Sequence, residues 1–401
     1  MQKIIDRKVK QYFDSSGVSL LESRILIVDD SEFSRSILIE IFKKNGFRNI
    51  EYAEDGEIGL EKLESFEPDI IILDIVMPKV DGFEFCERVR GCEKFSGLPI
   101  LVQSGTSDPY NITKIFSVGA TDFVSKPVNA EEVIVRSIVH LENKILINDL
   151  MKYRKKAEEE LRNAREMQNN IVPSDDCIYK SERMYGLSIA AYFEPSFEVG
   201  GDLWGMKNIS DNEVAIYSVD FSGHGVTSAL NTFRLHTILQ SEDSFSDDPS
   251  LFLYNVNNRL KKLLNVGQFA TMIYAVINIK KNVMTYASAG HTSPIVFREN
   301  GEGEMLDSAG VPLGVARNTT YDLKETEFSK GDLVLMYSDA LIETGNEQGD
   351  FLSEKDIFNL VKYSKGLDSK VIMEALLEKY HKHCGAVEQS DDLTINIYKR
   401  K

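Results

Sequence analysis

The sequence predicts a multidomain fold, with an α/β doubly wound domain, a long helical linker and an α+β domain built as a β-sandwich flanked by helices. Three observations support this prediction. Apolar runs alternate with helical segments up to about residue 140, the stretch 140–172 contains neither glycine nor proline, and β-rich runs dominate the remainder. A chain of 401 residues also exceeds the size of one ordinary hydrophobic core.

The composition excludes several classes of protein. With 42% hydrophobic and 27% charged residues, the chain is typical of folded soluble proteins. We find no apolar run of about 18 residues and no signal-peptide block at the start, so we expect a cytoplasmic protein without membrane contact. The net charge of -17 opposes nucleic-acid binding, which relies on clustered Lys and Arg. The four cysteines form no CxxC pair, which predicts reduced thiols.

The first domain is expected over residues 23–140, after an N-terminal extension at 1–22. Short apolar runs, among them RILIVDD, DIIILDIVMP and PILVQSG, alternate there with amphipathic helical segments. Such an alternation predicts a parallel sheet covered by helices on both faces. Ligands of these sheets bind beyond the carboxyl ends of the strands.

Polar side chains follow the strands of this predicted sheet. Asp29 and Asp30 close the first strand, Asp74 the third and Ser104 the fourth, and Lys126 follows the fifth. Three crowded carboxylates repel one another unless a cation lies among them, and oxygen ligands suit Mg²⁺. The sequence therefore predicts a magnesium site where one carboxylate can accept a phosphoryl group, while the lysine and the hydroxyl bind the transferred oxygens.

These residues resemble the receiver domain of two-component response regulators, a flavodoxin-like fold, over essentially all of residues 23–142. The match includes the Asp29–Asp30 pair, LDIVMPKVDG around Asp74, and Lys126 before Pro127. The resemblance implies that a histidine kinase or phosphotransfer protein phosphorylates Asp74, and that the Lys126–Pro127 peptide is cis. It also implies that Ser104 and Lys126 bind the phosphoryl group, that Phe123 is the switch aromatic, and that Mg²⁺ is held by Asp29, Asp30, Asp74 and the Val76 carbonyl.

Residues 141–173 are expected to form a helical coiled-coil linker that ends at Pro173. Apolar residues recur there every three or four positions, with charges between them: Leu146, Leu150, Tyr153, Ala157, Leu161, Ala164, Met167 and Ile171. This pattern predicts a parallel coiled coil in a homodimer. The alternative is a single helix lying on one domain.

Residues 174–401 form the second predicted domain, in which runs such as NEVAIYSVDFS and DLVLMYSD are interrupted by helical segments. Several carboxylates lie beside its strand-like runs: Asp202, Asp220, Asp339, Asp391 and Asp392. Hard carboxylate ligands select Mg²⁺ or Mn²⁺ over zinc. Two such ions can activate water for in-line attack on a phosphoryl group.

Glycines near these carboxylates permit close approach of the backbone to ions or phosphate: Gly200, Gly201, Gly223 and Gly225. His224 is a candidate general acid by position, whereas His291 in SAGHTSP is expected to be structural.

The order of these motifs, with ASAGHTSP and GDLVLMYSDALIE, resembles the PPM family of metal-dependent Ser/Thr protein phosphatases, in its bacterial SpoIIE/RsbU-like branch, over about residues 185–398. The resemblance implies two or more Mn²⁺ or Mg²⁺ ions. The implied catalytic residues and ligands are Asp202, Asp220 as the bridging ligand, the Phe221 carbonyl, Asp339 and Asp391, supported by Gly201, Gly223 and Asp392. Three positions depart from the family: Gly205 and Asn278 replace acidic residues, and Ala340 replaces glycine.

The two resemblances together imply a response regulator in which phosphorylation of Asp74 acts through the linker helix. The regulated reaction would be hydrolysis of phosphoserine or phosphothreonine on an anti-sigma-factor antagonist of the STAS type. The alternative is a weak or inactive phosphatase fold that binds a sigma factor or an anti-sigma regulator as an adaptor. Loss of two or more metal aspartates would favour the adaptor, and the sequence keeps all four principal ones.

Overall fold

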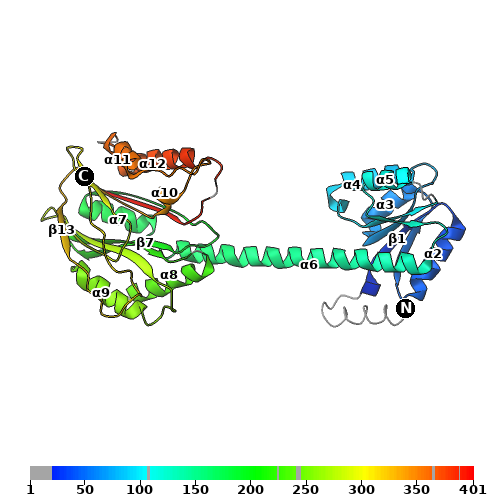
Figure 1. The fold of residues 1–401 in the computed structure, drawn as a ribbon, viewed down its shortest axis with the longest axis horizontal. Helices are drawn as coiled ribbons and strands as arrows, with labels where there is room; N and C mark the ends of the chain where they lie inside the picture. The colour runs from blue at the N-terminus through cyan, green and yellow to red at the C-terminus, as the bar shows by residue number, and fades with distance from the viewer. Residues whose placement is uncertain (1–19, 106–108, 224, 241–244, 364–365, 388) are drawn as a thin grey trace. The chain divides into compact units, whose positions relative to one another are not determined.

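The computed structural model describes residues 20–105, 109–223, 225–240, 245–363, 366–387 and 389–401. Most of the expected extension 1–22, and His224, lie outside the described residues. The chain divides into two compact units, 1–156 and 157–401, and helix α6 (Ala130–Asn169) runs through the division (Figure 1). Of the helices described, none combines the length and the apolar character needed to cross a membrane.

The first unit contains a five-stranded, wholly parallel sheet in the order β2-β1-β3-β4-β5. Its central strands are almost continuously apolar and buried, as expected for a sheet with helices on both faces. This arrangement confirms the predicted doubly wound α/β fold. The strands are β1 (Arg24–Val28), β2 (Asn49–Ala53), β3 (Ile70–Asp74), β4 (Ile100–Ser104) and β5 (Asp122–Ser125).

Helices on both faces of this sheet begin at side-chain caps. Ser31, Asp55 and Asp81 each accept a hydrogen bond from the backbone amide three residues later, which satisfies an otherwise unpaired helical donor. The helical elements are η1 (Leu20–Glu22), α2 (Glu32–Lys44), α3 (Gly56–Phe66), α4 (Gly82–Gly91), η2 (Glu93–Phe95), α5 (Pro109–Ser117) and the start of α6. The Lys126–Pro127 peptide before α6 is cis, as the receiver resemblance implied.

The first turns of α6 belong to the core of the first unit. Val133, Ile134, Ile138 and Leu141 are buried together with residues of β1 and α2. The linker helix therefore starts as a packed element of the sheet domain, because its first apolar face covers the sheet. Further along, the apolar side chains of Leu146, Leu150 and Tyr153 are exposed.

The second unit is a sandwich of two five-stranded antiparallel sheets, in the orders β13-β10-β9-β8-β7 and β12-β11-β14-β15-β6. Its strands are β6 (Leu187–Glu194), β7 (Asp202–Ser210), β8 (Glu213–Phe221), β9 (Ala270–Asn278), β10 (Val283–Ser288), β11 (Ile295–Phe297), β12 (Gly303–Met305), β13 (Lys324–Glu327), β14 (Leu333–Tyr337) and β15 (Leu393–Arg400).

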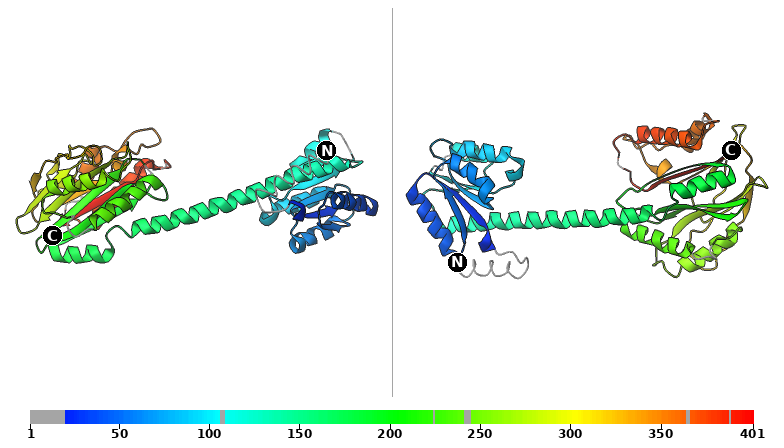
Figure 2. Two further views of the ribbon diagram at one scale, coloured as in Figure 1. Left: turned by 90° about the horizontal axis from the view of Figure 1, so that it is seen from below. Right: turned by 180° about the vertical axis from the view of Figure 1, so that it is seen from behind.

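Helices cover the outer faces of both sheets, which confirms the predicted α+β sandwich (Figures 1 and 2). In β9, Met272 and Tyr274 point to the layer of α8 and α9, whereas Ile273 and Ala275 point to the core between the sheets. A third core joins the other sheet to α11 and α12. The helices are α7 (Asp175–Tyr185), α8 (Val226–Leu239), α9 (Pro249–Leu260), α10 (Ala340–Glu343), α11 (Glu354–Tyr363) and α12 (Ser369–Cys384). All four cysteines are free thiols.

Candidate functional site

The carboxyl ends of the parallel strands hold a compact acidic group. Oxygens of Asp29, Asp30 and Asp74 lie within 4.8 Å of one another, and no other group of this kind occurs among the described residues. Asp29 and Asp74 are buried, and Asp30 is exposed. Three hard oxygen ligands at one solvent-accessible corner fit a single Mg²⁺ ion, which retains several waters.

Lys126 partly neutralises this group. Its Nζ lies 2.6 Å from Oδ2 of Asp74 and 3.8 Å from Oδ2 of Asp29. Burial nevertheless raises the pKa of Asp74, because the loss of hydration outweighs the attraction of Lys126. Ser104, at the end of β4, is buried beside this corner of the sheet, and Phe123 in β5 makes an edge contact with Phe116 at 6.1 Å between ring centroids.

Several residues that fix Asp29 were not predicted from the sequence. Its carboxylate accepts hydrogen bonds from the Ser31 amide at 2.9 Å and the Ser34 hydroxyl at 2.6 Å, and Nε2 of Gln103 lies 3.4 Å away. The serines could have been inferred from the strand-to-helix turn after the aspartate pair. Gln103 could not, because it reaches Asp29 from a strand that is distant in sequence.

A second acidic group lies at one rim of the sandwich. Pairing of β7 with β8 places Asp202 opposite Asp220. Asp339 follows β14, and Asp391 precedes β15, its antiparallel neighbour. Both sheets therefore contribute carboxylates to this rim. Among the described residues, only Asp29, Asp30 and Asp74 have oxygens that all lie within 4.8 Å of one another, so the four rim aspartates are spaced more widely.

Burial and mutual repulsion govern the protonation of these carboxylates. Burial, with Asp220 next in importance, raises the pKa of Asp202 well above its ordinary value. Burial together with Asp339 and Asp391 raises the pKa of Asp220 to about 8, and burial and Asp391 raise that of Asp339. Buried carboxylates that repel one another are typical of sites where bound cations neutralise the charge.

Asp392 differs from its neighbours because its carboxylate accepts hydrogen bonds from backbone amides. One carboxylate oxygen accepts a hydrogen bond from the Ser196 amide at 2.8 Å, and the other accepts a short one from the Gly201 amide. A Cβ atom at Gly200 would collide with this carboxylate, so a glycine is required there. Asp392 thus holds the 200–202 turn, and Thr394 orients Asp202 through a 2.6 Å hydrogen bond.

Comparison with known proteins identifies the two domains. Family models match residues 25–137, as the response regulator receiver domain, and residues 210–401, as stage II sporulation protein E (SpoIIE). The chain is 26% identical over 217 residues to phosphoserine phosphatase RsbU of Bacillus subtilis, an alignment that covers 54% of this chain but only 64% of RsbU. It is 27% identical over 318 residues to the Regulator of RpoS of Escherichia coli (strain K12), covering 75% of this chain and 90% of that protein.

Among solved structures, the SiaA-PP2C domain of Pseudomonas aeruginosa aligns with a TM-score of 0.56 at 21% identity, covering 62% of this chain and 99% of that domain. This likeness shows a shared fold. The chain joins a response-regulator receiver domain to a SpoIIE-type phosphatase domain. The match to the phosphatase family model begins at residue 210, so it leaves out Asp202 and the turn before it.

The three departures from the phosphatase family are accommodated by the structure. Gly205 lies on the strand face opposite Asp202, and the ring of Tyr217 fills the space that a side chain at 205 would need. Asn278 is the last residue of β9, and Thr271 of the same strand pairs with Asp220. Asn278 therefore lies roughly 20 Å along the strand from the position opposite Asp220. Ala340 lies in α10, and its side chain is buried in the core beneath α11 and α12.

The end of helix α6 contacts the phosphatase site directly, which the sequence did not reveal. Gln168 is buried, its Nε2 donates a 2.7 Å hydrogen bond to the Gly200 carbonyl, and its Oε1 accepts a 3.1 Å bond from the Gly200 amide. Nε2 of Gln168 also lies 3.4 Å from Oγ1 of Thr232 in α8. Gln168 therefore ties the linker helix to the turn that carries Asp202.

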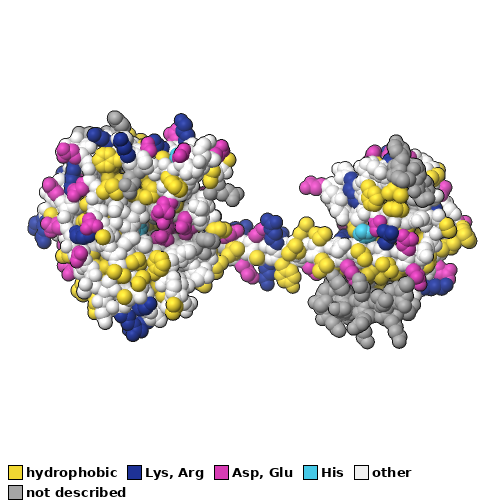
Figure 3. All heavy atoms as spheres, in the orientation of Figure 1, with side chains coloured by type: hydrophobic (Ala, Val, Ile, Leu, Met, Phe, Trp, Pro, Cys, Tyr) yellow, Lys and Arg dark blue, Asp and Glu magenta, His cyan; other side chains and the backbone are white. Residues whose placement is uncertain are grey.

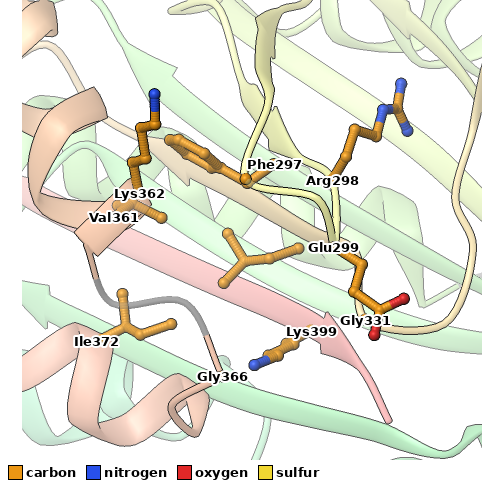
Figure 4. A pocket seen from close by; sticks show the side chains of 11 residues that line it. Phe297, Arg298, Glu299, Gly331, Val361, Lys362, Gly366, Ile372 and Lys399 are labelled. Atoms are coloured by element: carbon orange, nitrogen blue, oxygen red, sulfur yellow. The ribbon is translucent and has the colours of Figure 1, made fainter.

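Two other features of the phosphatase domain lie apart from the carboxylates. His291 is buried, and burial lowers its pKa to about 4, so it is neutral, in keeping with a structural role. A pocket of about 150 Å³ lies between the second sheet and α11 and α12 (Figure 4). Apolar side chains such as Ile372 line it, and the Lys362 side chain extends away from Ile372. It includes none of the clustered aspartates.

Replacing Asp220 by Asn should stabilise the phosphatase domain when a chelator removes divalent ions. A carboxyl whose pKa rises on folding, here to about 8, destabilises the folded state above its unfolded pKa. The stabilisation should therefore be small near pH 4 and grow to about 1–3 kcal/mol near pH 8. Denaturant titration of the full chain, followed by the fluorescence of Trp204, the single tryptophan, measures it. Asp211→Asn, in the exposed β7–β8 turn, is the control. An equal effect of Asp220→Asn at both pH values would contradict the repulsion.

Proposed function

We propose that this chain is a cytoplasmic response regulator in which phosphorylation of Asp74 controls a metal-dependent protein Ser/Thr phosphatase. The observation that carries the proposal is the crowding of Asp202, Asp220 and Asp339 at the rim of the sandwich, where burial and mutual repulsion raise their pKa values. Carboxylates in this state bind divalent cations strongly, because a cation removes the repulsion.

In the proposed reaction, Mn²⁺ or Mg²⁺ ions, when bound, would supply an activated water and neutralise the phosphate. The chain's own residues position this chemistry. Asp220 would bridge the ions with help from the Phe221 carbonyl, and Asp202, oriented by Thr394, would complete one side. Asp339 and Asp391 would close the other side from the second sheet. The Gly201 and Gly223 backbones would lie close to the ions, and Asp392 would keep Gly201 in place.

The receiver site would accept the phosphoryl group from a histidine kinase or a phosphotransfer protein. Asp29, Asp30 and the Val76 carbonyl would hold Mg²⁺ together with Asp74. Lys126, which now contacts Asp74, would move to the transferred phosphoryl oxygens, and Ser104 would bind another of them. Phe123 would respond to the displacement of Ser104, as the receiver resemblance implies.

Helix α6 is the proposed route of control. It starts inside the receiver core, and its penultimate residue, Gln168, is bonded to both backbone groups of Gly200. A rotation or shift of the helix would break these buried hydrogen bonds, so the proposed switch has a bonded and a broken state. The turn before Asp202 would move with it.

The exposed apolar residues of α6 support a homodimer. Leu146, Leu150 and Tyr153 are between 56% and 74% exposed and follow one another at spacings of four and three. A parallel coiled coil would bury them against the same residues of a second copy. Receiver phosphorylation would then act on the pairing of two α6 helices.

As substrate we propose a phosphorylated anti-sigma-factor antagonist of the STAS type. The support is the family resemblance and the similarity to a protein named phosphoserine phosphatase RsbU. The second candidate function is an adaptor that binds a sigma factor or an anti-sigma regulator without catalysis. The similarity to a protein named Regulator of RpoS, in an alignment that covers 90% of that protein, supports a regulatory role. The retained aspartates favour the enzyme.

Hydrolysis of a phosphoserine peptide by the full chain should require Mn²⁺ and Asp220. Asp220→Asn should lower the rate at least about a hundredfold, since it removes the proposed bridging ligand. Release of inorganic phosphate, with and without chelator, measures this. Asp211→Asn should keep the wild-type rate. Absence of hydrolysis by wild type across several phosphopeptides would favour the adaptor.

Phosphorylation of Asp74 should change the phosphatase rate, and the change should depend on Gln168. We expect an acyl-phosphate donor to alter the rate severalfold in wild type and to have no effect on Asp74→Asn. Gln168→Ala should abolish the response while Asp74 is still phosphorylated, because the helix loses both bonds to Gly200. Glu166→Ala, an exposed position on the same helix, is the control. Identical wild-type rates with and without the donor would exclude coupling.

Leu150→Glu should convert the dimer into a monomer. A charge at an apolar position of the seam opposes its burial against a second copy. Light scattering of the full chain measures the mass, which should fall by half. Asn163→Glu adds the same charge outside the apolar series and should leave the mass unchanged. A wild-type chain that is monomeric at all concentrations would contradict the proposed coiled coil.

A further inference from the structure

Six apolar side chains of the phosphatase domain are exposed on segments that adjoin the Asp220 loop. They are Val226, Leu230, Val266, Phe269, Val311 and Val315, and each is at least 37% exposed. They come from α8, from the loop before β9 and from the segment between β12 and β13. Together they are called the rim patch below.

Phe269 joins this patch to the catalytic carboxylates. The Ser222 amide donates a 3.0 Å hydrogen bond to the Phe269 carbonyl, and the Phe269 amide donates a 3.1 Å bond to the Ser222 hydroxyl. Ser222 follows Asp220 by two residues, a span of at most about 7 Å of chain. The exposed ring of Phe269 is therefore a near neighbour of the proposed metal site.

The segment between β12 and β13 is held against the start of β9 by a pair of backbone hydrogen bonds. Ala270 and Leu313 exchange two hydrogen bonds, of 3.0 and 2.8 Å. Leu313 itself is buried, whereas Val311 and Val315 on either side of it are exposed. Because the two segments run antiparallel, Val315 lies on the side of this pair towards Phe269 and Val311 lies on the other side.

Helix α8 completes the patch. Val226 is its first residue, and Leu230 lies one turn later on the same side. One turn further, Arg234 donates a 3.1 Å hydrogen bond to the Leu263 carbonyl, which joins the helix to the loop before β9. In Figure 3, apolar side chains gather over α8 next to a group of acidic side chains.

The fold does not need these side chains to be apolar. Helix α8 already buries Ala229, Leu235 and Leu239 on its opposite side. Apolar side chains that gather on an exposed surface without a role in the core mark interaction sites. A peptide whose phosphoserine reaches Asp220 also reaches the surface around Phe269, because Ser222, two residues after Asp220, is bonded to Phe269. The complementary chemistry is therefore apolar.

We propose that the rim patch docks apolar residues that flank the phosphoserine of the protein substrate. The inference rests on the proposed phosphatase function and adds a specificity to it. The carboxylates and their ions would recognise the phosphate, which all phosphoserine substrates share, whereas the patch would select the sequence around it.

The test compares two synthetic phosphoserine peptides of equal length and charge, one with Leu and Val around the phosphoserine and one with Ser and Thr there. Binding to the full chain carrying Asp220→Asn is followed by fluorescence anisotropy, so that turnover is not needed. We expect the apolar peptide to bind at least about tenfold more tightly. Adding Leu230→Gln and Val266→Ser should remove that difference. Val371→Gln, at an exposed apolar position of α12, is the matched control and should retain it.

The outcomes show whether a substrate or a second copy of the chain covers the rim patch. Equal binding of the two peptides, or an unchanged preference in the Leu230→Gln/Val266→Ser variant, overturns the inference even if wild type hydrolyses both. A patch-dependent preference without any hydrolysis by wild type supports the docking surface and counts against the phosphatase function. If the patch variant halves the mass of the full chain in light scattering, a second copy covers the patch and the inference is wrong.

Discussion

Mutual repulsion of carboxylates at the rim of the sandwich is the constraint on which the phosphatase domain depends. Asp202 is buried and faces Asp220 across a strand pair, so two like charges are fixed next to each other. Donors hold the arrangement together: Thr394 binds Asp202, and Asp392 binds the backbone of the preceding turn. This repulsion lowers the stability of the folded domain, and a bound cation would remove it.

The receiver domain meets the same constraint in a different way. Lys126 lies 2.6 Å from Asp74, and Asp30 remains in contact with water, so part of the charge is already compensated. At the phosphatase rim, the main influences on Asp220 are burial and three other carboxylates. The charge of Asp74 is therefore partly compensated by Lys126, whereas that of Asp220 is surrounded by further carboxylates.

Gln168 links helix α6 to this rim through a chemically simple device. A primary amide offers one donor and one acceptor, and both are used on the same residue, Gly200. Because the contact is buried, water cannot readily replace the lost partners when the Gln168 amide separates from Gly200. Each polar group left unpaired would cost about 1–3 kcal/mol. Such a contact is either made or lost. That property suits a helix whose other end is part of the receiver core.

The sequence by itself determined the receiver site, because a parallel sheet brings the carboxyl ends of all its strands to one edge and the order of Asp29, Asp74 and Lys126 is enough to place them there. It also placed a set of carboxylates beside the strands of the second domain. Only the tertiary structure decided what surrounds them. Strand register set Asp202 against Asp220 and placed Asn278 at the far end of β9, packing of Tyr217 explained Gly205, and long-range contacts revealed Gln103 and Gln168. Those features depend on pairs of residues far apart in the chain, and local periodicity carries no information about such pairs.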